Sequence, residues 1–135
     1  MDARRMLGII VINYASADLL AENLTATAAA VPGARIVVVD NLSTAEERAR
    51  VEALSIANGW RLVPMDDNAG FGGGVNAGAA VAFDELGVTD ILLLNPDARI
   101  DGASVDAVAA ATADGPSVAS PRVEDAAGRV WFAGM

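Results

Sequence analysis

Leu7-Gly-Ile-Ile-Val-Ile-Asn13 is the stretch that decides the fold, because it is a short apolar run, rich in β-branched residues, that ends at an amide. Such a run is typical of a strand buried on both faces, as in a parallel sheet. A second run of this kind, Arg35-Ile-Val-Val-Val-Asp40, follows after an Ala-rich stretch. A helical connection between two buried strands predicts a right-handed crossover and therefore parallel pairing.

The same alternation of strand and helix continues along the chain. Pro32-Gly33 and Asn58-Gly59 are typical helix stops, and they separate the apolar runs from the amphipathic stretches. The pattern predicts an α/β fold with a mainly parallel sheet and helices on both faces. The expected strands are 7–13, 35–40, 60–65, 91–94 and 117–123, and the expected helices are 16–31, 43–57, 75–86 and 104–113.

Two of the expected helices have capping signals at their start. Ser16 is expected to cap the first helix, with Asp18 in its first turn. For the second helix two capping boxes are open, because Ser43 and Thr44 are each followed three residues later by a glutamate. After the last strand, Asp125-Ala-Ala-Gly128 predicts a turn that leads into another extended segment.

Composition excludes several kinds of chemistry. The 135 residues suit one domain, and 53% of them are hydrophobic, which is enough for a real core. The chain has no Cys, no His and no Lys, so it has no thiol nucleophile, no histidine base and no P-loop lysine. A net charge of −9 argues against nucleic-acid binding. Carboxylates, amides, hydroxyls, Arg and backbone amides remain for catalysis or binding.

No apolar run is long enough to span a membrane. The run near the start, 6–12, is far shorter than the roughly 20 residues that a spanning helix needs. It also ends at Asn13 without a small-residue cleavage site, so it does not resemble a signal peptide. We therefore expect a cytoplasmic protein.

Short polar residues follow four successive expected strands. In a parallel sheet these strand ends lie at one edge, which is where ligands bind in open α/β folds. One polar residue after a strand is usually a turn former or a cap, but four such sets at one edge predict a binding site. The sets are Asn13-Tyr14, Asp40-Asn41, Asp66-Asp67-Asn68 and Asn95-Pro96-Asp97.

The fourth set is suited to a hard metal ion. Pro96 ends the strand because it cannot donate to the sheet, and Asp97 follows directly. One carboxylate beside an amide suits Mg²⁺ or Mn²⁺, which retain waters and take further ligands from substrate phosphates. The alternative is that Asp97 only caps the following turn.

The third set opens a glycine-rich segment, Asn68-Ala-Gly-Phe-Gly-Gly-Gly-Val-Asn-Ala-Gly78. We expect a loop over 66–74 that leads into a helix. Glycine lets the backbone approach a ligand closely, and a helix N-terminus favours anions, so the two together favour an anionic ligand. The alternative is a flexible loop with close helix–sheet packing at Gly78. A match to the dinucleotide fingerprint is weak here, since that fingerprint follows the first strand.

These motifs together resemble the family 2 glycosyltransferases. The resemblance covers nearly the whole chain, and the nearest branch is the rhamnosyltransferase-like one that builds bacterial cell-surface polysaccharides. A further stretch, Pro121-Arg-Val-x-Asp125-x-x-Gly128-Arg-Val, also matches that branch. The four motifs that carry the resemblance, in order, are Ile10-Val-Ile-Asn-Tyr14, Val37-Val-Val-Asp40-Asn-x-Ser43, Asn68-x-Gly-Phe-Gly-Gly-Gly-x-Asn76-x-Gly78 and Leu92-Leu-Leu-Asn-Pro-Asp97.

The resemblance implies a GT-A fold that binds a nucleoside diphosphate sugar, such as a dTDP- or UDP-sugar and in particular dTDP-rhamnose. It implies that Asp40 contacts the pyrimidine base and that Asp97, the last position of the family's D-x-D element, holds Mg²⁺ or Mn²⁺. Asn95 replaces the first acid of that element, so direct metal ligation by Asn95 is not expected. The remaining residues expected at the nucleotide are Asn13, Tyr14, Asn68, Gly70, Gly72, Asn76 and Asn95.

The family's general base lies downstream of the stretch that this chain matches, so the resemblance implies no catalytic base within residues 1–135. We expect a partial GT-A domain, the donor-binding half, without the acceptor-binding half. The implied partners are the nucleotide-sugar donor and a saccharide or lipid-linked acceptor. Peripheral membrane association and homo-oligomers are further expectations.

Two other classes fit parts of the pattern. A receiver-like regulatory module would explain the size, the acidity and an acid at the end of the second strand, but it needs a lysine on its last strand. A dehydrogenase domain would need glycines in the first strand–helix turn, where this chain has Asn13-Tyr-Ala-Ser16.

Overall fold

The computed structural model describes residues 1–133. Two compact units are present, one over residues 2–99 and another formed from residue 100 onward together with Met1. The first unit contains all four strands of the main sheet and every residue that we expect at the site.

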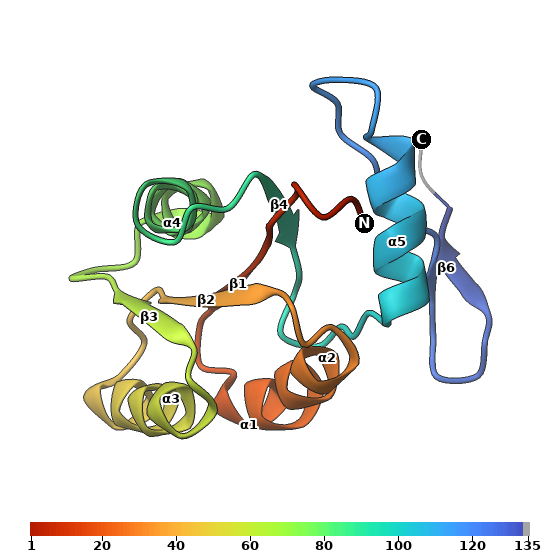
Figure 1. Ribbon diagram of the computed structural model, residues 1–135. Helices are drawn as coiled ribbons and strands as arrows, with labels where there is room; N and C mark the ends of the chain where they lie inside the picture. The colour runs from red at the N-terminus through yellow and green to blue at the C-terminus, as the bar shows by residue number, and fades with distance from the viewer. Residues whose placement is uncertain (134–135) are drawn as a thin grey trace. The chain divides into compact units, whose positions relative to one another are not determined.

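The sheet of the first unit is parallel throughout, as the sequence predicts (Figure 1). Its strand order is β3-β2-β1-β4, so the first strand of the chain lies inside the sheet. In register, Asn13 at the end of β1 lies beside Asp40 at the end of β2. The bounds are β1 (Leu7–Asn13), β2 (Arg35–Asp40), β3 (Arg61–Pro64) and β4 (Asp90–Leu93).

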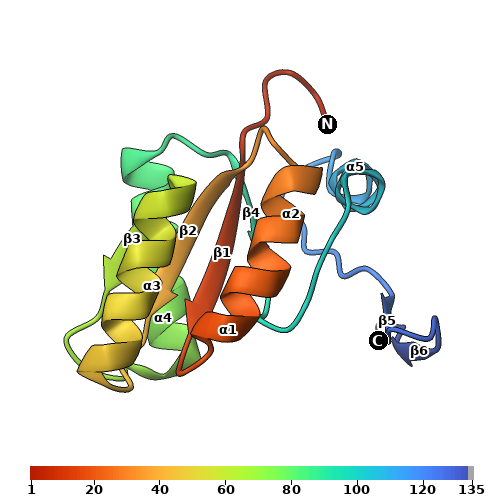
Figure 2. The ribbon, with the colours of Figure 1, turned by 90° about the horizontal axis from the view of Figure 1, so that it is seen from below.

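Helices cover both faces of this sheet (Figure 2). The first crossover is one continuous helix with a π-helical turn in its middle, and it consists of α1, η1 and α2. This helix and α3 lie on one face of the sheet, and the helix made of α4 and η2 lies on the other face (Figure 1). The bounds are α1 (Ala17–Leu19), η1 (Leu20–Leu24), α2 (Thr25–Ala30), α3 (Ala45–Asn58), α4 (Gly70–Ala80) and η2 (Val81–Glu85).

Alternation along the central strands builds two separate cores. Ile9 and Val11 point to the face of α1, α2 and α3, where they pack with Leu20 and Val51. Ile10 points to the opposite face, toward the helix made of α4 and η2. Side chains that are fully buried on both faces explain why the strands are uninterrupted apolar runs.

Two glycines let α4 approach the sheet closely. A Cβ at Gly78 would lie 2.8 Å from Ile10 Cγ2 and 2.8 Å from Val39 Cγ2, which is closer than real Cβ contacts allow. A Cβ at Gly74 would lie 3.1 Å from Ile12 Cγ2. Close packing at Gly78, the alternative noted from the sequence, is therefore present.

The expectation of a loop over 66–74 is wrong in its second half, because α4 begins at Gly70. A run of glycines has poor intrinsic helix propensity. Packing against the sheet overrides that propensity here, since only residues without a Cβ allow the helix to lie so near β1 and β2. The glycine segment is therefore a short loop, 66–69, followed directly by the first helical turns.

The capping signals hold for α3 but not for α1. The backbone N–H of Glu47 donates to Thr44 Oγ1 at 3.1 Å, so the Thr44 box is the one that forms. Gly59 ends that helix in the left-handed region with φ of 69°. Ser16 makes no side-chain cap, and its hydroxyl donates to the carbonyl of Tyr14. Glu47 Oε2 instead accepts from the backbone N–H of Ala17 at 3.3 Å.

The second unit contains α5 (Gly102–Ala111) and a two-stranded antiparallel hairpin, β5 (Val123–Glu124) and β6 (Val130–Phe132). The expectation of a fifth parallel strand over 117–123 is wrong, because residues 117–122 form no strand. Pro121, which has no N–H to donate, lies inside that stretch. The expected turn at 125–128 is confirmed, since Asp125 Oδ1 accepts from the backbone N–H groups of Ala127 and Arg129.

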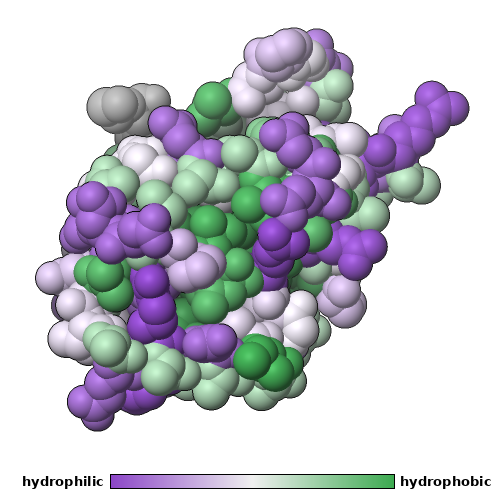
Figure 3. All heavy atoms as spheres, turned by 90° about the vertical axis from the view of Figure 1, so that its left-hand side faces the viewer, coloured by the Kyte–Doolittle hydropathy of each residue, from purple (hydrophilic) through white to green (hydrophobic). Residues whose placement is uncertain are grey.

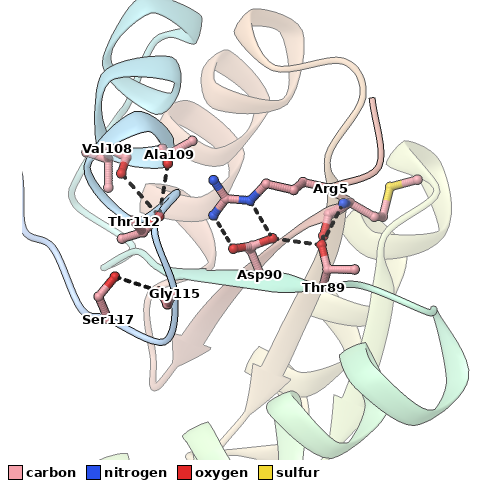
Figure 4. Close-up of polar contacts among 9 residues, drawn as sticks. Arg5, Thr89, Asp90, Val108, Ala109, Thr112, Gly115 and Ser117 are labelled. Carbon is pink, nitrogen blue, oxygen red and sulfur yellow. Dashed lines mark hydrogen bonds and ion pairs between the residues drawn. The ribbon is translucent and has the colours of Figure 1, made fainter. Parts of the chain in front are cut away.

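An ion pair fixes the beginning of β4 beside β1 (Figure 4). Arg5 donates through Nε to Asp90 Oδ2 at 3.0 Å and through Nη2 to Asp90 Oδ1. Thr89 Oγ1 also donates to Asp90, and the backbone N–H of Met6 donates to Thr89 Oγ1. The hydrogen bonds from Arg5 lower the pKa of Asp90. The pair therefore links the segment before β1 to the first residue of β4.

The face that contains β3, α3 and α4 has a band of hydrophobic atoms between polar rims (Figure 3). β3 is an edge strand of the sheet, and its Leu62 and Val63 are half-buried. Within residues 1–133, no helix is long and apolar enough to cross a membrane.

Candidate functional site

The ends of β1 and β2 meet in a buried polar pair. Asn13 Nδ2 donates to Asp40 Oδ1 at 3.1 Å, and both side chains are fully buried. Parallel register explains the contact, because Asn13 and Asp40 are Cα partners. Both lie on the sheet face that α1 and α3 cover, since they continue the alternation of Val11 and Val38.

Arg48 on α3 completes this pair. Its Nε donates to Asp40 Oδ2 at 2.7 Å, and its Nη2 donates to the backbone carbonyls of Asp40 at 3.1 Å and Met65 at 2.5 Å. One guanidinium therefore fixes the carboxylate at the end of β2 and the residue that follows β3. A buried carboxylate is costly unless it is paired and hydrogen-bonded, and Asp40 has both kinds of partner.

Three buried polar atoms at the ends of β1 and β2 have no hydrogen-bond partner among the described residues. They are Asn13 Oδ1, Asn41 Oδ1 and Ser43 Oγ. Unpaired buried polar atoms are costly, so native structures usually satisfy them with protein, water or a ligand. All three belong to segments at the carboxyl ends of β1 and β2.

The backbone directly beyond both strands is in an unusual conformation. Ala15 has φ of 52° and Leu42 has φ of 37°, a region that residues with a side chain rarely adopt. Such conformations store strain and are found often at functional sites. The two strained residues lie immediately after Tyr14 and Asn41, on the segments that lead into α1 and α3.

The start of α4 is held near the same edge. Asn68 Oδ1 accepts from the backbone N–H of Gly70 at 2.9 Å, and Asn41 Nδ2 donates to the carbonyl of Gly70 at 2.9 Å. Gly70 has φ of 75°, which a residue with a side chain would adopt only with strain. Gly72 is exposed, and a Cβ there would meet no other atom within 4 Å. The first turn of α4 therefore presents open backbone and the positive end of a helix.

The turn after β4 carries Asn95 and Asp97, both exposed. The backbone N–H of Ala98 donates to the carbonyl of Asn95 at 3.0 Å and closes the turn. Asn23, from the π-helical turn η1, donates through Nδ2 to the carbonyl of Pro96 at 3.1 Å. Arg99 Nε donates to Asn23 Oδ1 at 2.7 Å. Asn23 therefore clamps the turn that presents Asp97.

Asp97 fits a site of the Mg²⁺ or Mn²⁺ type that is completed by the substrate. Its carboxylate makes no hydrogen bond or ion pair with any other described residue, so its oxygens are available. No group of three or more acidic, His or Cys side chains could hold a metal ion within residues 1–133. Mg²⁺ commonly uses only one or two carboxylates together with phosphates and waters, so one free carboxylate is compatible with it.

The structure brings together some of the expected site residues but not all. Asn13 and Asp40 are hydrogen-bonded to each other, as are Asn68 and Gly70. Tyr14 follows Asn13, and its side chain is 55% exposed. Its backbone carbonyl accepts a hydrogen bond from Ser16 Oγ. Asn76 is exposed on the second turn of α4, and its side chain makes no hydrogen bond within the described part of the chain.

Sequence reasoning missed three residues that hold the site in place, namely Arg48, Asn23 and Arg99. Each acts over a long sequence separation or from a helix face, so no local motif reveals it. A weak signal existed for Asn23, because a polar residue that lies among apolar ones in a predicted helix needs a partner when it is buried.

Comparisons with known proteins show the family and the fold. A family model described as Glycosyl transferase family 2 matches residues 8–131. The low-salt glycan biosynthesis hexosyltransferase Agl10 of Haloferax volcanii is 36% identical over 95 residues, which is 70% of this chain and 29% of that protein. This chain therefore spans less than a third of the length of that relative.

Solved structures of S. aureus TarS 1-349 have the same fold. The complex with UDP matches with a TM-score of 0.60 and 19% identity, over 88% of this chain and 41% of TarS 1-349. The complex with UDP-GlcNAc matches with a TM-score of 0.58 and 20% identity, over 88% and 40% of the two chains. At these identities the likeness shows the GT-A type of fold alone. The match of the family model over nearly all of the sequence shows that this chain belongs to glycosyl transferase family 2.

Proposed function

We propose that the carboxyl edge of the sheet binds a nucleoside diphosphate sugar for inverting glycosyl transfer. The observation that carries the proposal is the convergence, at one edge, of the buried pair Asn13–Asp40, the open first turn of α4 and the free carboxylate of Asp97. The base then lies at the ends of β1 and β2, with Tyr14 beside it. The diphosphate lies between α4 and the turn after β4.

The chemistry of these groups suits a leaving diphosphate. Backbone N–H groups at a helix N-terminus stabilise negative charge, and glycine at Gly70 and Gly72 leaves the backbone accessible. Asp97 is the residue that would hold Mg²⁺ or Mn²⁺, which neutralises charge on the diphosphate when bound. Asn95 and Asn76 complete the proposed lining as neutral hydrogen-bonding groups.

The base is proposed to be uracil or thymine, and dTDP-rhamnose is the donor that the motif resemblance favours. The TarS structures, which contain UDP and UDP-GlcNAc, support a pyrimidine diphosphate donor, and the likeness to the hexosyltransferase Agl10 supports a sugar as the transferred group. A pyrimidine imide N–H needs an acceptor, and the oxygens of Asn13 and Asp40 are the acceptors at this position. The choice between UDP and dTDP sugars rests on the motifs.

Transfer to the acceptor requires groups that we do not assign to this chain. In an inverting transfer, an acceptor hydroxyl oxygen attacks the anomeric carbon while the bond to the diphosphate breaks, and a general base takes the hydroxyl proton. We propose that this chain supplies donor binding and leaving-group stabilisation, and that the acceptor is a saccharide or a lipid-linked saccharide. Cytoplasmic location, association with the inner face of a membrane, and homo-oligomers belong to this proposal.

Isothermal titration calorimetry of the 135-residue chain tests the donor site. UDP, dTDP, ADP and GDP, each with Mn²⁺ and then with a chelator, are compared at equal ionic strength. We expect UDP and dTDP to bind in Mn²⁺ more tightly than the purine nucleotides. Equal binding of all four nucleotides contradicts the proposed base site, and binding of none of them contradicts the proposed donor site as a whole.

A further inference from the structure

The amide of Asn23 holds the chain on both sides of Asp97. Its Nδ2 donates to the carbonyl of Pro96 at 3.1 Å, and its Oδ1 accepts from Arg99 Nε at 2.7 Å. A carbonyl only accepts and a guanidinium only donates, so these two partners fix how the amide is turned. Asn23 is 8% exposed, and water therefore competes little for its hydrogen bonds. One buried side chain thus holds the residue before Asp97 and the second residue after it.

Arg99 is also held by the residue that precedes Asn23. Its Nη2 donates to Glu22 Oε1 at 3.0 Å, so two consecutive residues of η1 bind one guanidinium. Consecutive side chains of an α-helix diverge by about 100°, because the helix has 3.6 residues per turn. A π-helical turn closes its hydrogen bonds one residue later and is wider, so neighbouring side chains diverge less. The geometry of η1 therefore favours the double contact with Arg99.

Thr25 supports the π-helical turn from within the helix. The shift from the regular hydrogen-bond pattern to that of a π-helix leaves carbonyls without their usual backbone partner. Thr25 Oγ1 donates to the carbonyl of Ala21 at 2.6 Å and lies 3.2 Å from the carbonyl of Glu22. Such bonds from a threonine to the preceding turn bend helices away from regular geometry. The hydroxyl of Thr25 therefore stabilises η1 in the conformation that the structure shows.

We infer that η1 is an alignment element for Asp97, with Asn23 and Arg99 as positioning residues. Thr25 stabilises the π-helical turn, and this turn directs Asn23 toward the segment after β4. The inference rests on the proposed metal role of Asp97 and adds to it residues that lie outside the donor site. Asp97 is not part of a larger acidic cluster within residues 1–133, so the position of this one carboxylate decides how well it binds a metal ion.

Four variants separate the parts of this element. Asn23→Leu has a similar size and removes both hydrogen bonds. Asn23→Asp keeps an acceptor for Arg99 but places an oxygen against the carbonyl of Pro96. Thr25→Val removes only the hydroxyl, and Thr25→Ser retains it and is the matched control. Thermal denaturation first confirms that each variant is folded.

Two measurements are made on the parent and on each variant. Amide hydrogen exchange, followed by NMR without metal or nucleotide, reports on the backbone N–H of Ala98, which closes the turn by donating to the carbonyl of Asn95 at 3.0 Å. Calorimetry gives the dissociation constants of UDP in Mn²⁺ and in chelator. The ratio of these two constants is the gain in affinity from the metal. General damage to the donor site would weaken UDP binding in both conditions, whereas a displaced Asp97 reduces only the gain.

We expect Asn23→Leu to raise the exchange rate of the Ala98 amide and to reduce the gain from Mn²⁺, each by about five- to tenfold, the effect of losing one or two hydrogen bonds. Asn23→Asp should reduce the gain nearly as much, because two acceptors then face each other at Pro96. Thr25→Val should show the same two changes at about two- to threefold, since bonds of this kind are weak. Thr25→Ser should match the parent, and UDP binding in chelator should be the same in all five proteins.

Each result supports or overturns the inference. An Ala98 exchange rate in Asn23→Leu equal to that of the parent overturns it, as does an equal loss of UDP binding in Mn²⁺ and in chelator. A Thr25→Val variant that behaves like Thr25→Ser overturns the role of η1. In these cases the proposed donor site stands. UDP binding by the parent that is independent of Mn²⁺ contradicts the proposed metal role of Asp97 and the inference together.

Discussion

Replacing Gly78 by Ala tests whether close packing of α4 on the sheet determines the structure of the glycine segment. A Cβ at this position lies 2.8 Å from the Cγ2 atoms of Ile10 and Val39. Both neighbours are β-branched and belong to the central strands, so neither can turn away easily. Inserting a methyl group into a well-packed core costs about 1–3 kcal/mol.

A second effect opposes this cost. Alanine is better than glycine inside a helix by about 1 kcal/mol, so the substitution gains that amount from the backbone. Because two contacts are violated together, we expect the upper part of the packing range and a net loss of about 1–2 kcal/mol in the free energy of unfolding. Gly74→Ala, with its nearest contact at 3.1 Å, should lose less. Gly72→Ala, where the added methyl group meets no atom within 4 Å, is the matched control and should be neutral or more stable.

Urea unfolding followed by tryptophan fluorescence measures these differences. The chain has two tryptophans, and Trp60 is 8% exposed whereas Trp131 is 79% exposed. In a Trp131→Phe background, Trp60 alone reports on the unit that contains the sheet. A Gly78→Ala variant as stable as the Gly72→Ala variant would refute the packing argument. Equal destabilisation at all three glycines would refute it as well, because contact distance would then not determine the outcome.

Three further predictions concern the turn after β4 and the ion pair at its start. Asp97→Ala should remove the dependence of UDP binding on Mn²⁺, and calorimetry that shows equal Mn²⁺ dependence in the variant would contradict the metal assignment. Asn23→Ala should weaken UDP binding in Mn²⁺ several-fold but leave UDP binding in chelator unchanged, because Asn23 holds only the turn that presents Asp97. Weaker UDP binding in both conditions would contradict a positioning role for Asn23. Arg5 lowers the pKa of Asp90 from its ordinary value of 3.8. The ion pair therefore stabilises the fold fully above pH 3.8, and this stabilisation is lost as the pH falls through the lowered pKa. The parent should therefore exceed Asp90→Asn in urea midpoint at pH 7, with a difference that shrinks below about pH 4, and a difference independent of pH would contradict this reasoning.

The sequence predicted the parallel sheet and its polar edge because both depend on local patterns. Buried strands are visible as apolar runs, and parallel connections then bring Asn13 and Asp40 to the same edge. The helix at Gly70 was not predictable from propensity, since its stability depends on contacts with β1 and β2. The misplaced strand over 117–123 shows the same limit, because apolar content suggested a strand while Pro121 excluded regular pairing.

The supporting residues of the site were not predictable for a different reason. Arg48 looks like any charged residue on an exposed helix face until the fold brings it against Asp40 and Met65. Asn23 faces the turn after β4 from a π-helical turn, whose extra residue changes which side of the helix a side chain occupies. Long-range pairing and an irregular helix have no signature in a single sequence.

The strand order β3-β2-β1-β4 also has a kinetic consequence. The three strands on one side of the sheet are joined by short consecutive crossovers, whereas β4 returns to β1 across contacts 83 residues apart, such as Met6 to Thr89. Closing a longer loop costs more chain entropy and slows folding. β4 is therefore expected to dock last during refolding and to open first in native-state hydrogen exchange. The strand that presents Asp97 is then the part of the sheet whose amides exchange before global unfolding.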